Sequence, residues 1–129
     1  MILREPSAVM PKIYGPEPQH GWCYYFEQAE LARQFDDWGE VVKLGNQAFK
    51  LEDFPNNPVE RFVFIEGYAH MGNWKRAVEL SKVSYKVSKD YVGPLLCVLW
   101  QRIHTETTGG VERTAALDEI QSLLACPVQ

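Results

Sequence analysis

The sequence predicts an all-α domain made of three stacked antiparallel helix hairpins. Two short polar breaks, Asp37-Trp38 and Asn73-Trp74, place their tryptophans 36 residues apart (74 − 38). Around these breaks, apolar residues recur at the i, i+3, i+4 spacing of helices, and no segment shows the alternation of a strand. A fixed period of this length is typical of helix pairs that pack on copies of themselves.

Length and charge limit the kinds of protein this chain can be. Its 129 residues match one domain, and a hydrophobic content of 46% is sufficient for a core. The net charge is −4 and basic residues are interleaved with acidic ones, so we expect no nucleic-acid partner. No apolar run reaches the roughly 18–20 residues of a membrane-spanning helix, and Arg4 and Glu5 come too early for a signal peptide. We therefore expect a soluble chain without a transmembrane segment, whose parent protein could still be membrane-bound.

The three cysteines, Cys23, Cys97 and Cys126, are odd in number and widely spaced. This pattern does not resemble a disulfide framework, so we expect buried free thiols. Free thiols mildly favour a cytoplasmic location, whereas the tail of a membrane protein could be extracytoplasmic.

Residues 1–20 are expected to form an extended arm or linker, because their prolines are too closely spaced for a helix. The arm also carries several apolar side chains, so we expect part of it to lie against the folded body. Its prolines and apolar residues are Pro6, Pro11, Pro16, Pro18, Ile2, Leu3, Val9, Met10, Ile13 and Tyr14.

The helical domain is predicted to cover residues 21–129, beginning with two helices. The first runs from Trp22 to about Phe35, and the second from Asp37, as its N-cap, to about Leu51. The apolar residues expected to face inward are Phe26, Ala29, Leu31, Ala32 and Phe35 in the first helix and Val41, Leu44, Ala48 and Phe49 in the second.

Four further helices follow from caps and helix-breaking residues. Asn57 and Pro58 begin the third helix, which ends near Met71 with Gly72 in the left-handed conformation, and Asn73 caps the fourth, about 74–88. Gly93-Pro94 is expected to open the fifth, which runs to about Thr107. The sixth spans about Val111 to Ala125. The apolar residues expected in the fourth and sixth are Ala77, Val78, Leu80, Val83, Val87, Ala115, Ala116, Ile120, Leu123 and Leu124.

An overlay at an offset of 36 pairs Phe26 with Phe62 and Glu30 with Glu66. The second unit resembles the tetratricopeptide repeat, and the positions that carry this resemblance are Phe64, Tyr68, Gly72, Trp74, Ala77 and Ser81. Ser81 and Ser84 depart from the usual residues of that family, and the first unit is more degenerate, with Asp36 in place of the glycine. The resemblance implies an α-solenoid whose last two helices act as its cap.

A second resemblance covers about residues 17–90. The segments Glu17–Arg33 and Glu60–Asn73 look like the soluble tails of large bacterial membrane proteins similar to glycosyltransferases of the dolichyl-phosphate-mannose type. This resemblance implies an accessory, substrate-positioning domain, with any catalysis in a membrane part outside this chain.

The first helix of each pair lines the inner groove in the tetratricopeptide geometry. Its aromatic residues would anchor a ligand, its carboxylates would accept hydrogen bonds, and its arginine would donate them. A protein or peptide partner is the expected ligand, although the aromatic rings could instead be core and the charges merely solvated. The candidate binding residues are Phe26, Glu30, Arg33, Phe62, Glu66 and His70.

Other chemistry is not indicated. His20 and Cys23 lack the further ligands that zinc requires, and His70 and His104 are isolated in the sequence. No phosphate-binding loop or nucleophile–base pattern is present, so we expect neither a metal, a cofactor nor an enzyme. The favoured function is a protein–protein interaction or scaffolding module of a larger protein, and the alternative is the accessory domain described above.

Overall fold

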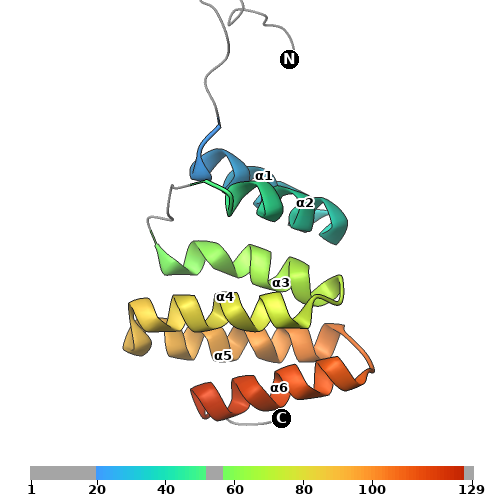
Figure 1. The fold of residues 1–129 in the computed structure, drawn as a ribbon, viewed down its shortest axis with the longest axis vertical. Coiled ribbons are helices and arrows are strands. Elements are labelled where there is room, and N and C mark those ends of the chain that lie inside the picture. Colours follow the sequence, from blue (N-terminus) through green and yellow to red (C-terminus); the bar gives the residue numbers. More distant parts are fainter. Residues whose placement is uncertain (1–19, 52–56, 127–129) are drawn as a thin grey trace, which may run out of the picture.

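The computed structural model describes residues 20–51 and 57–126, and this part of the chain is all-α (Figure 1). A 3-10 turn, η2, precedes α3, and these described residues contain no strand. The predicted N-terminal arm lies outside them, apart from His20. The elements are α1 (Trp22–Gln34), α2 (Trp38–Ala48), η2 (Pro58–Arg61), α3 (Phe62–His70), α4 (Trp74–Val87), α5 (Lys89–Glu106) and α6 (Val111–Leu124).

The predicted helix caps are confirmed. The Asp37 carboxylate accepts a hydrogen bond from the Glu40 amide at 3.2 Å, and the Asn73 side chain accepts one from the Arg76 amide at the same distance. Asn57 likewise accepts from the amide two residues later, at 3.0 Å. Each cap satisfies a backbone N–H that has no partner inside its helix.

The turns before α2 and α4 have the same backbone geometry. Asp36 has φ 55° and Gly72 has φ 86°, so both occupy the left-handed region that closes a helix. Aspartate adopts this conformation more readily than most residues, which explains how Asp36 replaces a glycine. The following amide reaches back five residues in both turns, from Asp37 to Ala32 at 3.0 Å and from Asn73 to Tyr68 at 2.8 Å.

The predicted start of the fifth helix is wrong. The helix begins at Lys89, after Ser88, and Pro94 lies inside it. Proline at this point removes only its own bond to the Asp90 carbonyl, and both residues are exposed to water. Gly93 lets the Tyr85 ring approach, since a Cβ there would lie 3.3 Å from that ring. The first turn of α5 therefore forms despite the helix breaker.

The helices stack in sequence order, with α1 and α6 at opposite ends (Figure 1). Each helix packs on the next, and α1 on α3, α3 on α5 and α4 on α6 are also in contact. The core is densest around α3, where every residue from Val63 to Ala69 is buried. The core residues are Trp22, Ala29, Val41, Leu44, Ala48, Val63, Phe64, Ile65, Tyr68, Ala69, Ala77, Val78, Leu80, Val92, Leu96, Leu99, Trp100, Ile103, Ala116 and Ile120.

Several residues predicted to face inward are exposed. Leu31 of α1 and Phe35, which follows α1 directly, are 50% and 76% exposed, and Val83 and Val87 of α4 are also on the surface. These side chains lie on sides of their helices that no described element covers. The apolar spacing therefore predicted these two helices correctly, but it predicted more buried residues on each of them than the structure has.

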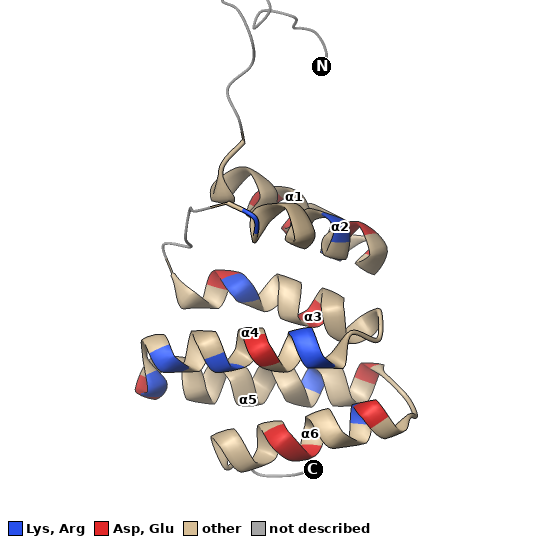
Figure 2. Cartoon of the chain, viewed as in Figure 1, with Lys and Arg blue, Asp and Glu red and all other residues tan. Residues whose placement is uncertain are grey.

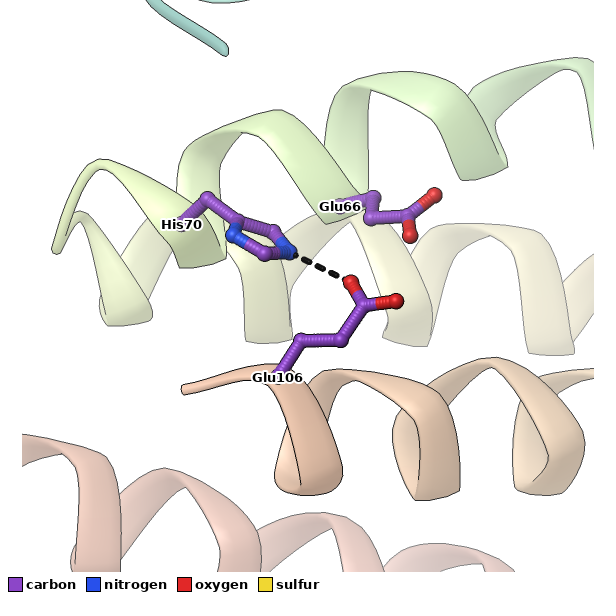
Figure 3. Close-up of side chains that lie close together, drawn as sticks. All are labelled: Glu66, His70 and Glu106. Carbon is purple, nitrogen blue, oxygen red and sulfur yellow. Dashed lines mark hydrogen bonds and ion pairs between the residues drawn. The ribbon is translucent and has the colours of Figure 1, made fainter. Parts of the chain in front are cut away.

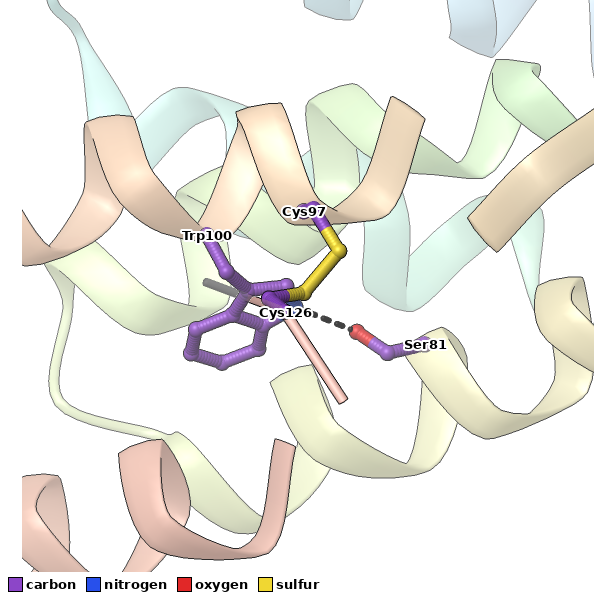
Figure 4. The surroundings of a disulfide bond; sticks show 4 residues. All are labelled: Ser81, Cys97, Trp100 and Cys126. Carbon is purple, nitrogen blue, oxygen red and sulfur yellow. Dashed lines mark hydrogen bonds between the residues drawn. A yellow bond between two sulfur atoms is a disulfide. The ribbon is translucent and has the colours of Figure 1, made fainter. Parts of the chain in front are cut away.

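The expectation of three buried free thiols is wrong. Cys97 of α5 and Cys126, just after α6, form a disulfide (Figure 4), and their Cα atoms lie 5.6 Å apart. Cys23 is free but exposed. The two cysteines are 29 residues apart in the sequence. Because α6 packs on α5, the two cysteines meet despite this separation. The argument for a cytoplasmic location, which rested on free thiols, therefore no longer holds.

No helix in residues 20–51 or 57–126 combines the length and apolarity that crossing a membrane requires. On α4, Lys and Arg are interspersed with Glu, as the sequence pattern predicts (Figure 2).

Gly67 sets the distance between α2 and α3. A Cβ at this position would lie 2.4 Å from Cγ1 of Val41, well inside van der Waals contact. We expect Gly67→Ala to lower the free energy of unfolding by about 1–3 kcal/mol, because overpacking outweighs the gain in helix propensity. Urea denaturation measures this change.

Gly39→Ala is the matched control, since its Cβ would approach nothing closer than 4.0 Å. It should be neutral or stabilise the fold by up to about 1 kcal/mol. Equal stability of the two variants would contradict a close approach at Gly67.

The disulfide should stabilise the fold by about 3 kcal/mol, because it closes a loop between residues 29 apart in the unfolded chain. Thermal melting with and without reductant should therefore differ for the native chain and not for Cys126→Ser. Cys23→Ser is the control, and it should melt like the native chain. Alkylation of three thiols in the unreduced protein would show that the bridge is absent.

Candidate functional site

A cleft of about 440 Å³ lies where α1, η2, α3 and α5 meet. Five of the six candidate binding residues line it, and only His70 does not. Its walls combine aromatic, aliphatic and charged side chains. The lining residues are Phe26, Glu30, Arg33, Asn57, Val59, Glu60, Phe62, Val63, Glu66 and Arg102.

Glu66 in the middle of α3 accepts hydrogen bonds from two arginines. Its Oε1 lies 2.8 Å from Arg33 Nε of α1 and 3.2 Å from Arg102 Nη2 of α5, and its Oε2 lies 2.9 Å from Arg102 Nε. The Glu66 side chain is only 2% exposed, whereas those of Arg33 and Arg102 are 34% and 40% exposed. One buried carboxylate thus ties together the first, third and fifth helices.

The electrostatics of this cluster favour the ionised form of Glu66. Burial alone would raise the pKa of the Glu66 carboxyl, but hydrogen bonds and charge from Arg102 and Arg33 lower it below the ordinary value of 4.5. The hydrogen bond to Glu66 raises the pKa of Arg33 against the opposing effect of burial. The cluster therefore keeps its three charges at neutral pH.

The sequence predicts Glu66 as a hydrogen-bond acceptor for a ligand, and in the structure Glu66 accepts hydrogen bonds from two arginines. Both of its oxygens are bonded to the arginines, so it serves to hold them in place. Glu30, which the overlay treats as its equivalent, is exposed and lines the cleft. Within the described part of the chain, Arg33 Nη1 and Nη2 make no hydrogen bond, so their N–H groups remain available. Glu30 and Arg33, together with the 40% exposed Arg102, are thus charged groups that a ligand can reach.

The apolar walls are partly buried side chains of α1 and α3. Phe26 and Phe62 pack against the core and still line the cleft. Glu60 of η2 accepts a hydrogen bond from Trp22 Nε1 at 2.8 Å, which fixes η2 against the start of α1. Trp22 also packs edge-on against Phe64, so its role is to anchor this end of the cleft.

His70 lies beside this cluster rather than in the cleft, and it is not isolated. Its Nε2 is 2.9 Å from Glu106 Oε1, as Figure 3 shows, and its ring stacks on Trp38 with the centroids 4.1 Å apart. Glu66, His70 and Glu106 offer ligand atoms within 4.8 Å of one another. Arg33 and Arg102 already hold both oxygens of Glu66 and add positive charge, so this grouping is a poor cation site.

Two residues of this region were not identified from the sequence: Arg102 of the cluster, and Glu106, which pairs with His70 beside it. Arg102 follows Glu66 by 36 residues, and Glu106 follows His70 by the same interval. The 36-residue period between Trp38 and Trp74, applied once more to Glu66 and His70, leads to Arg102 and Glu106 in the fifth helix. Sequence reasoning also gave no reason to expect the contact between Trp22 and Glu60.

Comparisons of the chain with protein-family models, with curated proteins and with solved structures find no match. The chemistry of the cleft is therefore the basis for a proposed function.

Replacing Glu66 should destabilise the fold. Glu66→Gln leaves two adjacent arginines without their counter-charge, so we expect a loss of about 3 kcal/mol in the free energy of unfolding at pH 7. Because folding lowers the pKa of Glu66, its contribution is present above the ordinary pKa and is lost as the pH falls through the lower, folded value. The native chain and Glu66→Gln should therefore begin to converge in stability below about pH 4.5 and should meet once the pH has fallen below the lower pKa of the folded state.

Glu106→Gln provides the control, because Glu106 is 42% exposed in its pair with His70. It should cost less than about 1 kcal/mol. Urea titrations between neutral and acidic pH measure both variants, and a Glu66→Gln protein as stable as the native chain would contradict the role of this cluster.

Proposed function

We propose that the six helices are three stacked antiparallel hairpins of the tetratricopeptide type. The matching turns at Asp36 and Gly72 support this arrangement, as do the two side-chain contacts that join residues 36 apart on α3 and α5. Ser81, which departs from the usual residue of that repeat, is compatible with this arrangement because it has a partner on the next helix. Its hydroxyl accepts a hydrogen bond from Trp100 Nε1 of α5 at 2.9 Å, beside the disulfide (Figure 4).

We propose that the chain is a protein–protein interaction or scaffolding module that binds a peptide segment of its partner in the cleft. The observation that carries this proposal is the combination of half-buried aromatic walls with reachable charges at Glu30 and Arg33. Apolar pockets with a few fixed polar groups are typical of ligand sites, and extended or helical peptides fit grooves between helices. The partner supplies apolar side chains that pack on Phe26 and Phe62, and polar groups that bond to Glu30 and Arg33.

We propose a non-catalytic role for Glu66, which the same chemistry supports. The most buried carboxylate, Glu66, has a lowered pKa and is held by two arginines, whereas a general acid or base needs a pKa near the working pH. Glu66 therefore positions other side chains and does not exchange a proton with a substrate.

The accessory domain of a membrane glycosyltransferase-like protein is the second candidate. The bond between Cys97 and Cys126 favours it, because disulfides persist in oxidising compartments such as those outside the bacterial cytoplasm. In that setting the same cleft holds a segment of the substrate protein or of the parent chain.

Selection from a library of random peptides displayed on phage, with the full chain as bait, tests the proposed cleft. We expect peptides whose affinity falls at least about tenfold with Phe26→Ala and with Glu30→Lys, because each change removes a group that lines the cleft. Fluorescence anisotropy of the labelled peptide measures the affinity.

Glu112→Lys is the control, since it makes the same charge change at an exposed position on α6. It should leave the affinity unaltered. Glu66 is unsuitable for this test, because its replacement affects folding. Failure to select any peptide, or selected peptides that ignore both cleft variants, would overturn the proposal.

A further inference from the structure

The outer face of α1 carries an apolar stripe whose only ring contact with a preceding described residue is at its first member, where the His20 ring stacks on Tyr24 with the centroids 3.7 Å apart. We define the α1 stripe as Tyr24, Gln28, Leu31 and Phe35. The three large apolar members are 40%, 50% and 76% exposed, and Gln28 is exposed between them. Large exposed apolar side chains that are contiguous on one face are uncommon unless they mark an interaction site.

The helices related to α1 bury the corresponding position. Residues 31, 67 and 103 are spaced by the same 36 residues that separate Glu66 from Arg102. Gly67 of α3 lies in close contact with Val41 of α2, and Ile103 of α5, a helix that packs on α4, is fully buried. In the described chain, α1 has no preceding helix. At the position of Leu31, α1 therefore leaves exposed a side chain that α3 and α5 enclose, whereas Met71, which corresponds in spacing to Phe35, is 56% exposed.

The opposite end of the stack does not complement this face. Residue 113 of α6 corresponds in spacing to Val41 and Ala77, which are both fully buried. Position 113 is an arginine, whose Nε donates to Thr107 Oγ1 at 2.9 Å and whose Nη2 donates to the His104 carbonyl at 2.8 Å. Head-to-tail stacking would place this charged group against Leu31. An open chain of copies is thus disfavoured, and an association through α1 must be closed.

We propose that the α1 stripe is a self-association surface, on which α1 of a second copy packs antiparallel about a two-fold axis. The stripe residues follow one another at intervals of four, three and four, which is the spacing of a helix–helix seam. Antiparallel pairing sets Tyr24 of each copy against Phe35 of the other, and Gln28 against Leu31. Each large ring thereby meets an aromatic partner.

The edges of the stripe fit the same pairing. The stripe contains no acidic or basic residue. On one side it is flanked by Glu27 and Gln34, and the two-fold axis brings Glu27 of one copy to Gln34 of the other, so that a carboxylate meets an amide rather than a second carboxylate. Tyr25 and Ala32 flank the other side, and they likewise bring no like charges together.

The dimer is weak, because one face of a single short helix is smaller than the roughly 800 Å² per partner of a stable interface. Sedimentation equilibrium of the full chain between about 10 µM and about 1 mM should show the mass rising from 14.8 kDa towards twice that value. Leu31→Glu should raise the dissociation constant at least about tenfold, because it buries a charge in the seam. Leu31 is half exposed in the monomer, so this variant should keep its helical circular dichroism spectrum and its melting temperature.

Val111→Ser is the matched control, because it removes an 86% exposed apolar side chain from the opposite end of the stack. It should leave the dissociation constant unchanged. A chain that stays monomeric at every concentration overturns the proposal and leaves the α1 stripe to a different protein or to residues 1–19. A dimer that survives Leu31→Glu, or that Val111→Ser removes, overturns it as well.

Cross-linking tests the orientation. In a Cys23→Ser background, a mixture of Gln28→Cys and Leu31→Cys chains should oxidise to mixed pairs faster than either chain forms pairs with itself. A preference for identical pairs would show a parallel seam and would overturn the antiparallel arrangement.

Discussion

The burial of Glu66 constrains the packing of three helices at once. An ionised carboxylate with its side chain almost completely enclosed costs several kcal/mol unless cations and hydrogen bonds replace water. Its two cations come from different helices, Arg33 from α1 and Arg102 from α5. A shift of either neighbouring helix relative to α3 would leave this carboxylate unsatisfied. The arginines therefore fix the register of α1, α3 and α5 and form the floor of the cleft.

Small side chains impose the complementary constraint on the other helix contacts. Gly45 and Gly67 let α2 approach α3, since a Cβ on either would lie within 3.0 Å of a neighbouring side chain. Ser81 and Ser84 play a related part on α4, where each buried hydroxyl is hydrogen-bonded: Ser81 donates to the Ala77 carbonyl and Ser84 to the Pro58 carbonyl. Both buried serines thus have defined hydrogen-bond partners, in keeping with the rule that buried hydroxyls need one.

Local interactions made most of the helix boundaries predictable, whereas contacts between helices decided the rest. Asp37 and Asn73 cap helices through hydrogen bonds to residues only three positions away, so their roles can be deduced from the local sequence. The burial of Glu66 and the pairing of Cys97 with Cys126 depend on how helices far apart in sequence meet, which apolar spacing does not specify. The position of Pro94 shows the same limit, because whether a helix extends past a proline depends on whether water reaches the freed carbonyl.

Two faces of α1 have separate roles in this picture. At 3.6 residues per turn, Phe26, Glu30 and Arg33 lie about 160° around the helix from the α1 stripe. A second copy on the stripe therefore leaves the cleft open, and a dimer presents two clefts that face away from each other. A partner with two copies of the recognised segment gains avidity when its linker spans both clefts, and a partner with one copy does not. Under the two proposals together, weak self-association lets a scaffold favour multivalent partners without any change in the cleft itself.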